Sequence, residues 1–232
     1  MNRKYFQMTT SDRTADIYIF GDITSWTWFE NDVSSYTLAR QLQDLKDVDH
    51  IRVFINSYGG EVAEATAIYN QLKNNPAKVT TVCDGFACSA ASVIFMAGDE
   101  RLMNKASRLM IHNAVTGARG NAAQLRKAAE DLESINELSI TAYMSKVNIA
   151  QEKLQELMDS ESWIKPEDAV AMGFASGIVE EDSGQTASQS AREAVMKALD
   201  GDAATPTPGT VKPPAEPPKQ KNKILKLFER SN

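Results

Sequence analysis

Ser89 lies in a run of mostly small residues, Gly85-Phe86-Ala87-Cys88-Ser89-Ala90-Ala91-Ser92, and an apolar segment follows at 93–98. This pattern predicts a hydroxyl group at the start of a helix, where free backbone N–H groups and the helix dipole stabilise developing negative charge. The chain contains 2 histidines, so few side chains could accept the proton of that hydroxyl, and we pair it with His112. The pair predicts nucleophilic catalysis; the alternative is a buried turn and an unrelated histidine.

The composition is that of a globular protein with one main domain. Of 232 residues, 42% are apolar and 24% are charged, enough for a soluble domain of about 180 residues and a tail. The net charge of −6 gives no reason to expect nucleic-acid binding. The chain opens without the apolar core of a signal peptide and has no run of about 20 apolar residues, so we expect a cytoplasmic protein with no membrane contact.

The two cysteines, Cys83 and Cys88, are too few and too close together for a disulfide framework. No histidine lies near them for a zinc site, so we expect neither a metal nor a cofactor. Cys88 directly precedes Ser89 and could itself act as a nucleophile, but we expect a small buried side chain there. His50, the other histidine, is expected to be a solvated surface residue.

The first half of the chain alternates between two kinds of apolar pattern. Short β-branched runs predict strands at 17–20, 51–56 and 79–83, and apolar residues at helical spacing predict helices at 34–46 and 63–72. Strands that alternate with helices at this spacing form right-handed crossover units. The sequence therefore predicts an α/β fold with a largely parallel sheet.

A long helical pattern follows at about 121–146. It exceeds what one domain of this size needs to cover its sheet, so it is either a plain surface helix or an arm that packs against a neighbouring subunit. A second helix is expected to start near Asn148, with Asn148 as N-cap and Gln151 completing a capping box, and to run to Met158. Pro166 opens a last short helix, which Gly173 ends.

The C-terminal part differs in composition. Residues 183–218 are polar and rich in proline, and the six prolines between 205 and 219 favour an extended linker. Residues 219–232 form a short basic amphipathic tail. This tail is either solvated or a tethered docking peptide for a partner protein.

Four motifs in order resemble the Clp protease proteolytic subunit family, and most closely the Clp-like head-maturation (prohead) proteases of tailed bacteriophages. The resemblance covers about 15–181, which leaves 1–15 as an N-terminal segment and 16–182 as the peptidase domain. It implies a Clp/crotonase-like fold with repeated β-β-α units and a long projecting helix. The motifs are Ile55-Asn56-Ser57-Tyr58-Gly59-Gly60, Gly85-Phe86-Ala87-Cys88-Ser89-Ala90-Ala91, Ser107-Arg108-Leu109-Met110-Ile111-His112 and Glu167-Asp168-Ala169-Val170-Ala171-Met172-Gly173.

The resemblance implies a serine endopeptidase with Ser89 as nucleophile and His112 as general base. Gly60 and Ala90 would supply the N–H groups of the oxyanion hole. Counting back from Trp163 puts Glu161 in the place of the family's aspartate, and Asp159 is the reserve. The resemblance also implies polypeptide substrates, here capsid or scaffolding proteins, and a ring-shaped homo-oligomer.

Three alternatives stay open at this point. A crotonase-like acyl-CoA enzyme would use the Gly-Gly turn but would give Ser89 and His112 no required role. A non-proteolytic structural or assembly protein would work through its tail. A serine–lysine dyad also occurs in the wider family, but nothing in the sequence places Lys105 against Ser89.

Overall fold

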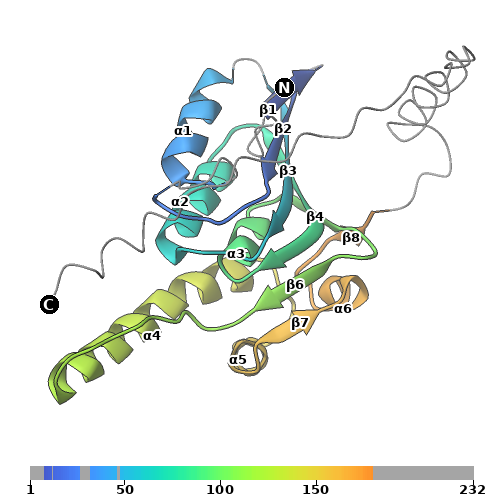
Figure 1. Cartoon of the computed structure of the whole chain (residues 1–232). Coiled ribbons are helices and arrows are strands. Elements are labelled where there is room, and N and C mark those ends of the chain that lie inside the picture. The colour runs from blue at the N-terminus through green and yellow to red at the C-terminus, as the bar shows by residue number, and fades with distance from the viewer. Residues whose placement is uncertain (1–7, 12, 27–31, 46–47, 180–232) are drawn as a thin grey trace, which may run out of the picture. The chain divides into compact units, whose positions relative to one another are not determined.

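The computed structural model describes residues 8–11, 13–26, 32–45 and 48–179, and it shows a sheet flanked by helices (Figure 1). The strand order along the main path of the sheet is β1-β2-β3-β4-β5-β8. All neighbours on this path from β2 onward are parallel, whereas β1 is antiparallel to β2. The predicted α/β fold with a largely parallel sheet is confirmed. The path comprises β1 (Met8–Ser11), β2 (Thr14–Ile19), β3 (His50–Ser57), β4 (Lys78–Cys88), β5 (Glu100–Met103) and β8 (Gly177–Ile178).

The core lies where apolar side chains of the sheet meet the helices. Alternate residues of β3, among them Ile51 and Val53, are buried, because one face of the strand packs inward. The helices α1 (Ser35–Asp44), α2 (Val62–Lys73) and α3 (Ala90–Phe95) lie together on one side of the sheet (Figure 1). The bounds of α1 and α2 agree with the helices predicted at 34–46 and 63–72 to within two residues, because apolar spacing is a local signal.

β4 is longer than the predicted strand at 79–83, and its two ends have different neighbours. Its first part pairs with β5 through 80–83, and its last part pairs with β6 (Arg108–Ile111) through 86–88. A register shift between Ile55 and Ser57 of β3 accompanies this change. β7 (Ser162–Ile164) then adds antiparallel to β6. The branch brings the carboxyl ends of β4 and β6 side by side.

Helix α4 (Ala122–Met144) confirms the predicted long helix. Asn121 caps it, and the side chain of Gln124 completes a capping box. Only the C-terminal end of α4 is buried, and the rest projects from the sheet (Figure 1). The segment that follows His112 runs along this helix, where the Ala114 N–H donates to Asn136 Oδ1 at 2.7 Å.

The predicted N-cap of the next helix is wrong. Helix α5 (Gln151–Asp159) begins after Ala150, and the side chain of Asn148 instead donates to the carbonyl of Ala171 at 3.1 Å. A tertiary contact with α6 (Pro166–Ala171) has therefore taken the polar group that would have capped the helix. Gly173, with φ of 82°, ends α6 as predicted.

The predicted linker at 183–218 and the amphipathic tail at 219–232 lie outside the described residues. At the other end, β1 pairs with β2, so the sheet begins before residue 16. In the described parts of the chain, no helix is both long and apolar enough to cross a membrane.

Candidate active site

Ser89 follows β4 directly and is the N-cap residue of α3, which confirms the predicted hydroxyl at a helix start. Its backbone is in an uncommon conformation, with φ of 54° and ψ of −125°. Such a conformation costs a non-glycine residue about 1–3 kcal/mol and is typical of functional turns. The Ser89 N–H donates to the Met110 carbonyl of β6 at 2.8 Å. The strand on one side and the helix on the other therefore hold the turn.

His112 comes directly after β6 and reaches the serine. Its Nε2 lies 2.7 Å from Ser89 Oγ. The two residues meet because β4 and β6 are parallel, so that the residues following Cys88 and Ile111 emerge at the same edge of the sheet. When Nδ1 carries the ring proton, Nε2 accepts the hydroxyl proton of Ser89. This geometry is the one that activates a serine for nucleophilic attack.

The glycine turn after β3 lies against the serine. Gly59 has φ of 106°, and a Cβ there would lie 2.8 Å from Ser89 Cβ and 3.0 Å from Ala90 N. Gly60 has φ of 148°, and a Cβ there would lie 2.0 Å from the Ile23 carbonyl oxygen. Only glycine fits this close approach of backbone to backbone.

Two backbone N–H groups near Ser89, those of Gly60 and Ala90, have no backbone acceptor among the described residues. Ile23 donates to the Gly59 carbonyl at 2.9 Å and accepts from the Glu61 N–H at 2.8 Å, which leaves the Gly60 N–H on the side facing away from Ile23. Ala90 is the first residue of α3, where the N–H has no partner within the helix. These are the two N–H groups that the family resemblance predicts for an oxyanion hole.

The two acidic residues of the predicted triad differ in their surroundings. Asp159 Oδ1 accepts from Gln155 Nε2 at 2.7 Å and from Asn113 Nδ2 at 2.8 Å, and these bonds, that of Gln155 first, lower the pKa of the Asp159 carboxyl. Glu161 is exposed, has φ of 48°, and its carboxylate makes no hydrogen bond or ion pair with any described residue. Among the described residues, neither carboxylate forms a hydrogen bond with His112. Asp159 is linked to it only through Asn113, the next residue in the sequence.

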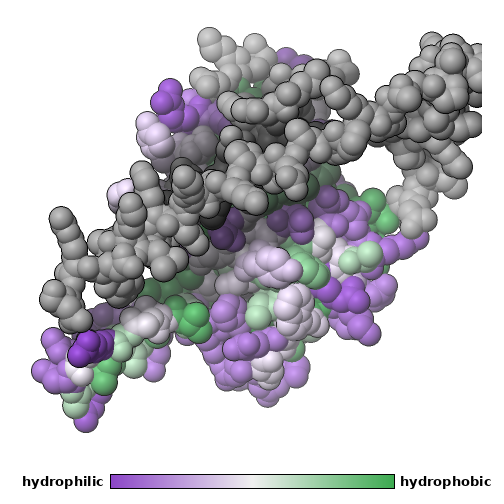
Figure 2. All heavy atoms as spheres, viewed as in Figure 1, coloured by the Kyte–Doolittle hydropathy of each residue, from purple (hydrophilic) through white to green (hydrophobic). Residues whose placement is uncertain are grey.

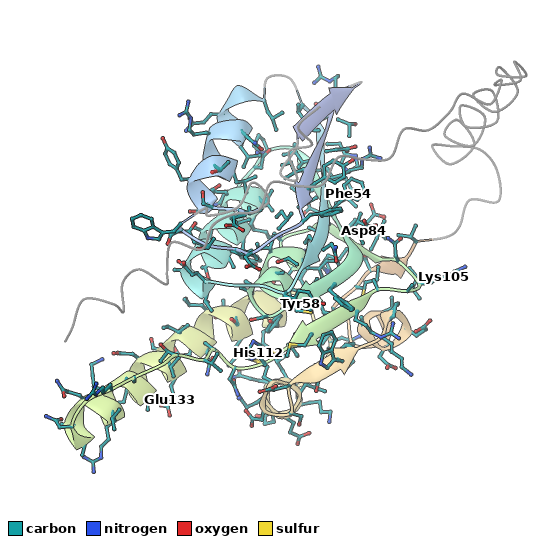
Figure 3. The ribbon with its side chains drawn as sticks, viewed as in Figure 1. Phe54, Tyr58, Asp84, Lys105, His112 and Glu133 are labelled. Carbon is teal, nitrogen blue, oxygen red and sulfur yellow. The ribbon has the colours of Figure 1, made fainter. Side chains whose placement is uncertain are left out.

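Ser89 and His112 open into a pocket of about 790 Å³. Leu132, Ile135 and Leu138 of α4 contribute apolar side chains to its lining, and Gly59 and Gly60 of the glycine turn also line it. Tyr58 and His112, labelled in Figure 3, both line this pocket and come from the ends of β3 and β6. The pocket can therefore receive an extended chain with apolar side chains next to the serine.

A model of the Clp protease family matches residues 10–182. The chain belongs to the Clp protease family. Its relatives include proteins named ATP-dependent Clp protease proteolytic subunit from Deinococcus radiodurans and Bacteroides fragilis, and subunit 3 from Rhizobium meliloti. The first is 34% identical over 133 residues, 56% of this chain and 65% of the relative. The second is 29% identical over 154 residues, which are 64% of this chain and 74% of the relative. The third is 30% identical over 169 residues, which are 72% of this chain and 84% of the relative.

Family membership bears on the alternatives left open by the sequence. The match is to Clp proteases, so the crotonase-like acyl-CoA reading is not favoured. Lys105 is exposed in the connection that precedes β6, whereas His112 follows that strand, and Figure 3 shows the two at opposite ends. A serine–lysine dyad through Lys105 therefore has no geometric support.

The two cysteine thiols, Cys83 and Cys88, are buried. Burial raises the pKa of Cys88 to about 11 and that of Cys83 to about 12, so both stay protonated at neutral pH. A protonated thiol is a poor nucleophile, which agrees with the expected small buried side chain at Cys88. His50 is half-buried, with Nε2 2.9 Å from Thr80 Oγ1, rather than fully solvated. Among the described residues, no three His, Cys, Asp or Glu side chains form a group that could hold a metal ion.

The structure adds residues that the sequence reasoning did not single out. Asn113 connects the segment after His112 to Asp159, and its position next to the histidine was the one available signal. Ser92 and Tyr143 form a buried hydrogen bond behind Ser89. No sequence pattern predicts that pair, because the two residues belong to different helices.

Proposed function

We propose that this chain is a serine endopeptidase of the Clp type. The observation that carries the proposal is the 2.7 Å contact between Ser89 Oγ and His112 Nε2. Ser89 Oγ attacks the carbonyl carbon of the scissile peptide bond as its proton passes to His112. The N–H groups of Gly60 and Ala90 stabilise the resulting oxyanion. His112 then gives the proton to the leaving amine, and water hydrolyses the acyl-enzyme.

We assign the orienting acid to Asp159 in preference to Glu161. The hydrogen bond from Asn113 holds Asp159 beside the segment that carries His112, whereas the Glu161 carboxylate has no partner among the described residues. Catalytic hydrogen bonds are often long or incomplete before substrate binds. A change of partner from Asn113 to Nδ1 of His112 would complete the triad.

The pocket supports polypeptide substrates with large apolar side chains next to the cleaved bond. Its α4 wall presents Leu132, Ile135 and Leu138, and burial of one such side chain contributes about 1.5–3 kcal/mol to binding. The motif resemblance to phage head-maturation proteases extends the proposal to capsid or scaffolding polypeptides. The same resemblance, together with the exposed apolar residues of α4, supports a ring-shaped homo-oligomer.

Labelling with a fluorophosphonate probe tests the chemistry. The probe should modify Ser89, located by mass spectrometry of the digested protein, and Ser89→Ala should abolish both labelling and cleavage of a fluorogenic peptide. Ser134→Ala, at an exposed serine of α4, serves as the control and should retain both.

Co-expression with a capsid precursor tests the substrate class. Wild-type protein should process the precursor, and folded Ser89→Ala should leave it intact. Processing by the Ser89→Ala protein would show that the nucleophile is assigned wrongly. Wild-type protein that takes up no probe and yet is needed for capsid assembly would favour the structural role.

A further inference from the structure

A chain of buried hydrogen bonds joins helix α4 to the backbone of the serine turn. The Tyr143 hydroxyl of α4 lies 2.6 Å from Ser92 Oγ of α3, and Ser92 Oγ lies 2.5 Å from the carbonyl oxygen of Ser89. Tyr143 is 1% exposed and Ser92 is fully buried. The same carbonyl also accepts from the Ser92 N–H at 2.9 Å. The two residues therefore act on the peptide group that follows the nucleophile.

The direction of the chain follows from its last member. A carbonyl oxygen can only accept a hydrogen bond, so the Ser92 hydroxyl donates to the Ser89 carbonyl. The Tyr143 hydroxyl must then donate to Ser92 Oγ. Burial raises the pKa of Tyr143 to about 12, which keeps the donating proton on the phenol at neutral pH. The order is thus Tyr143 O–H to Ser92 O–H to the Ser89 carbonyl.

The anchored carbonyl shares a planar trans peptide with the Ala90 N–H. In such a peptide the C=O and N–H bonds point in opposite directions. Holding the carbonyl toward Ser92 therefore holds the Ala90 N–H on the opposite side of the peptide, and the glycine turn lies close to that nitrogen, since a Cβ on Gly59 would be 3.0 Å from it. Loss of the Ser92 hydroxyl would leave the Ser92 N–H as the carbonyl's remaining donor, so that the peptide plane could tilt away from the place where negative charge develops.

We infer that Tyr143 and Ser92 are positioning residues that hold the Ala90 N–H at the oxyanion position. The inference rests on the proposed serine-peptidase function. The middle of the same helix α4 forms a wall of the pocket, and its buried end carries Tyr143. One helix therefore contacts substrate at one point and fixes the oxyanion donor at another.

A set of four variants tests the inference: Tyr143→Phe, Ser92→Ala, the double variant, and Tyr69→Phe as a matched control. Tyr69 is a partly buried tyrosine that contacts Ser145, just beyond the end of α4, at 3.5 Å and has no link to Ser89. Loss of a whole oxyanion donor lowers kcat by about 100–1000-fold, so a donor that is present but loosened should cost about 10-fold. We expect that loss of kcat in both single variants with KM changed less than about twofold, and no loss in Tyr69→Phe.

Thermal melting of the same variants separates positioning from stability. Ser92→Ala leaves the Tyr143 hydroxyl buried without an acceptor and should lower the melting temperature, whereas the double variant removes both polar groups and should regain much of it. Activity should not recover with it: kcat of the double variant should stay at the level of Ser92→Ala, because Tyr143 acts through Ser92. Binding of a peptide boronate, whose tetrahedral oxygen occupies the oxyanion position, should weaken by a factor similar to the loss of kcat.

The outcomes distinguish the inference from the function on which it rests. Wild-type protein that neither reacts with fluorophosphonate nor cleaves peptide would overturn both. An active wild type with Tyr143→Phe and Ser92→Ala within twofold of its kcat would overturn the positioning role alone. So would a kcat that recovers with the melting temperature in the double variant. If Tyr143→Phe does not fold, Ser92→Ala alone decides, through its kcat and boronate affinity.

Discussion

At the scale of single residues, the candidate site combines a strained serine with a histidine that reaches it from a neighbouring strand. The φ of 54° at Ser89 keeps its hydroxyl free of a capping bond, so that Oγ meets His112 instead of the helix backbone. The adjacent Cys88 thiol is held protonated by burial. Exposure and the contact with His112 therefore favour Ser89 over Cys88 as the proposed nucleophile.

The identity of the third residue is a prediction at this scale. Asp159→Asn should lower kcat/KM by up to about 10⁴-fold, because an amide in place of the carboxylate favours the wrong tautomer of His112. Glu161→Gln, the matched control, should stay within about threefold of wild type, since surface substitutions away from the site have small effects. Hydrolysis of a fluorogenic peptide measures both.

The reverse result would assign the acid to Glu161, as counting from Trp163 suggested. The lowered pKa of Asp159 sets the pH for the comparison. The hydrogen bonds to its charged form favour ionisation. Any contribution of the carboxylate to kcat/KM is therefore fully present above the ordinary pKa of an aspartate, and it is lost only as the pH falls through the lowered pKa. Neutral pH is therefore suitable for both variants.

At the scale of elements, the site depends on the turn between β3 and α2 and on the branch of β4. The glycine turn is held by backbone bonds to Ile23 on one side and lies against Ser89 on the other. The branch lets β6 run beside the end of β4 and brings His112 to the serine. The proposed mechanism needs both features, because the turn would supply an oxyanion donor and the branch would supply the base.

Gly60→Ala tests the turn. The added Cβ would lie 2.0 Å from the Ile23 carbonyl oxygen at a φ of 148°, so the backbone must shift and carry the Gly60 N–H with it. We expect kcat to fall at least about 100-fold, the effect of losing one oxyanion donor. Peptide hydrolysis gives kcat, and circular dichroism confirms that the variant is folded. Folded Gly60→Ala protein with wild-type kcat would remove Gly60 from the oxyanion hole.

At the scale of the whole molecule, the projecting part of α4 exposes apolar side chains. Leu125, which lies outside the pocket, is 45% exposed, whereas the exposed Leu138 and Val115 line the pocket. Figure 2 shows hydrophobic residues (green) along this helix among hydrophilic ones. An apolar surface on a projecting helix is typical of a contact with another subunit.

Leu125→Glu tests that contact without touching the pocket, because Leu125 is not among the pocket residues. Wild-type protein should have a mass in solution that is a multiple of the 25.5 kDa chain, and Leu125→Glu should shift it toward a single chain. Arg126→Glu introduces the same side chain at an already polar position and should leave the assembly intact. Light scattering measures all three. A wild-type protein that stays a monomer would contradict the ring.

Features that depend on neighbouring residues could be predicted from the sequence. The small-residue run placed Ser89 at a helix start, the Gly59–Gly60 pair marked a tight turn, and helical spacing predicted the long helix. These signals are local, because caps, turns and apolar periodicity act over a few residues. The misplaced cap at Asn148 shows their limit, since a contact with Ala171 outweighed the local preference.

Which of these residues meet could not be predicted from the sequence, because it depends on the packing of distant segments. Ser89 and His112 are 23 residues apart, Asn113 and Asp159 are 46 apart, and Ser92 and Tyr143 are 51 apart. Each contact depends on strand pairing or helix packing between distant segments, which no local pattern encodes. The contact of Asp159 with Asn113 and the link from Tyr143 to the serine turn are therefore visible only in the structure, because side-chain contacts across elements are set by the packing of the whole domain.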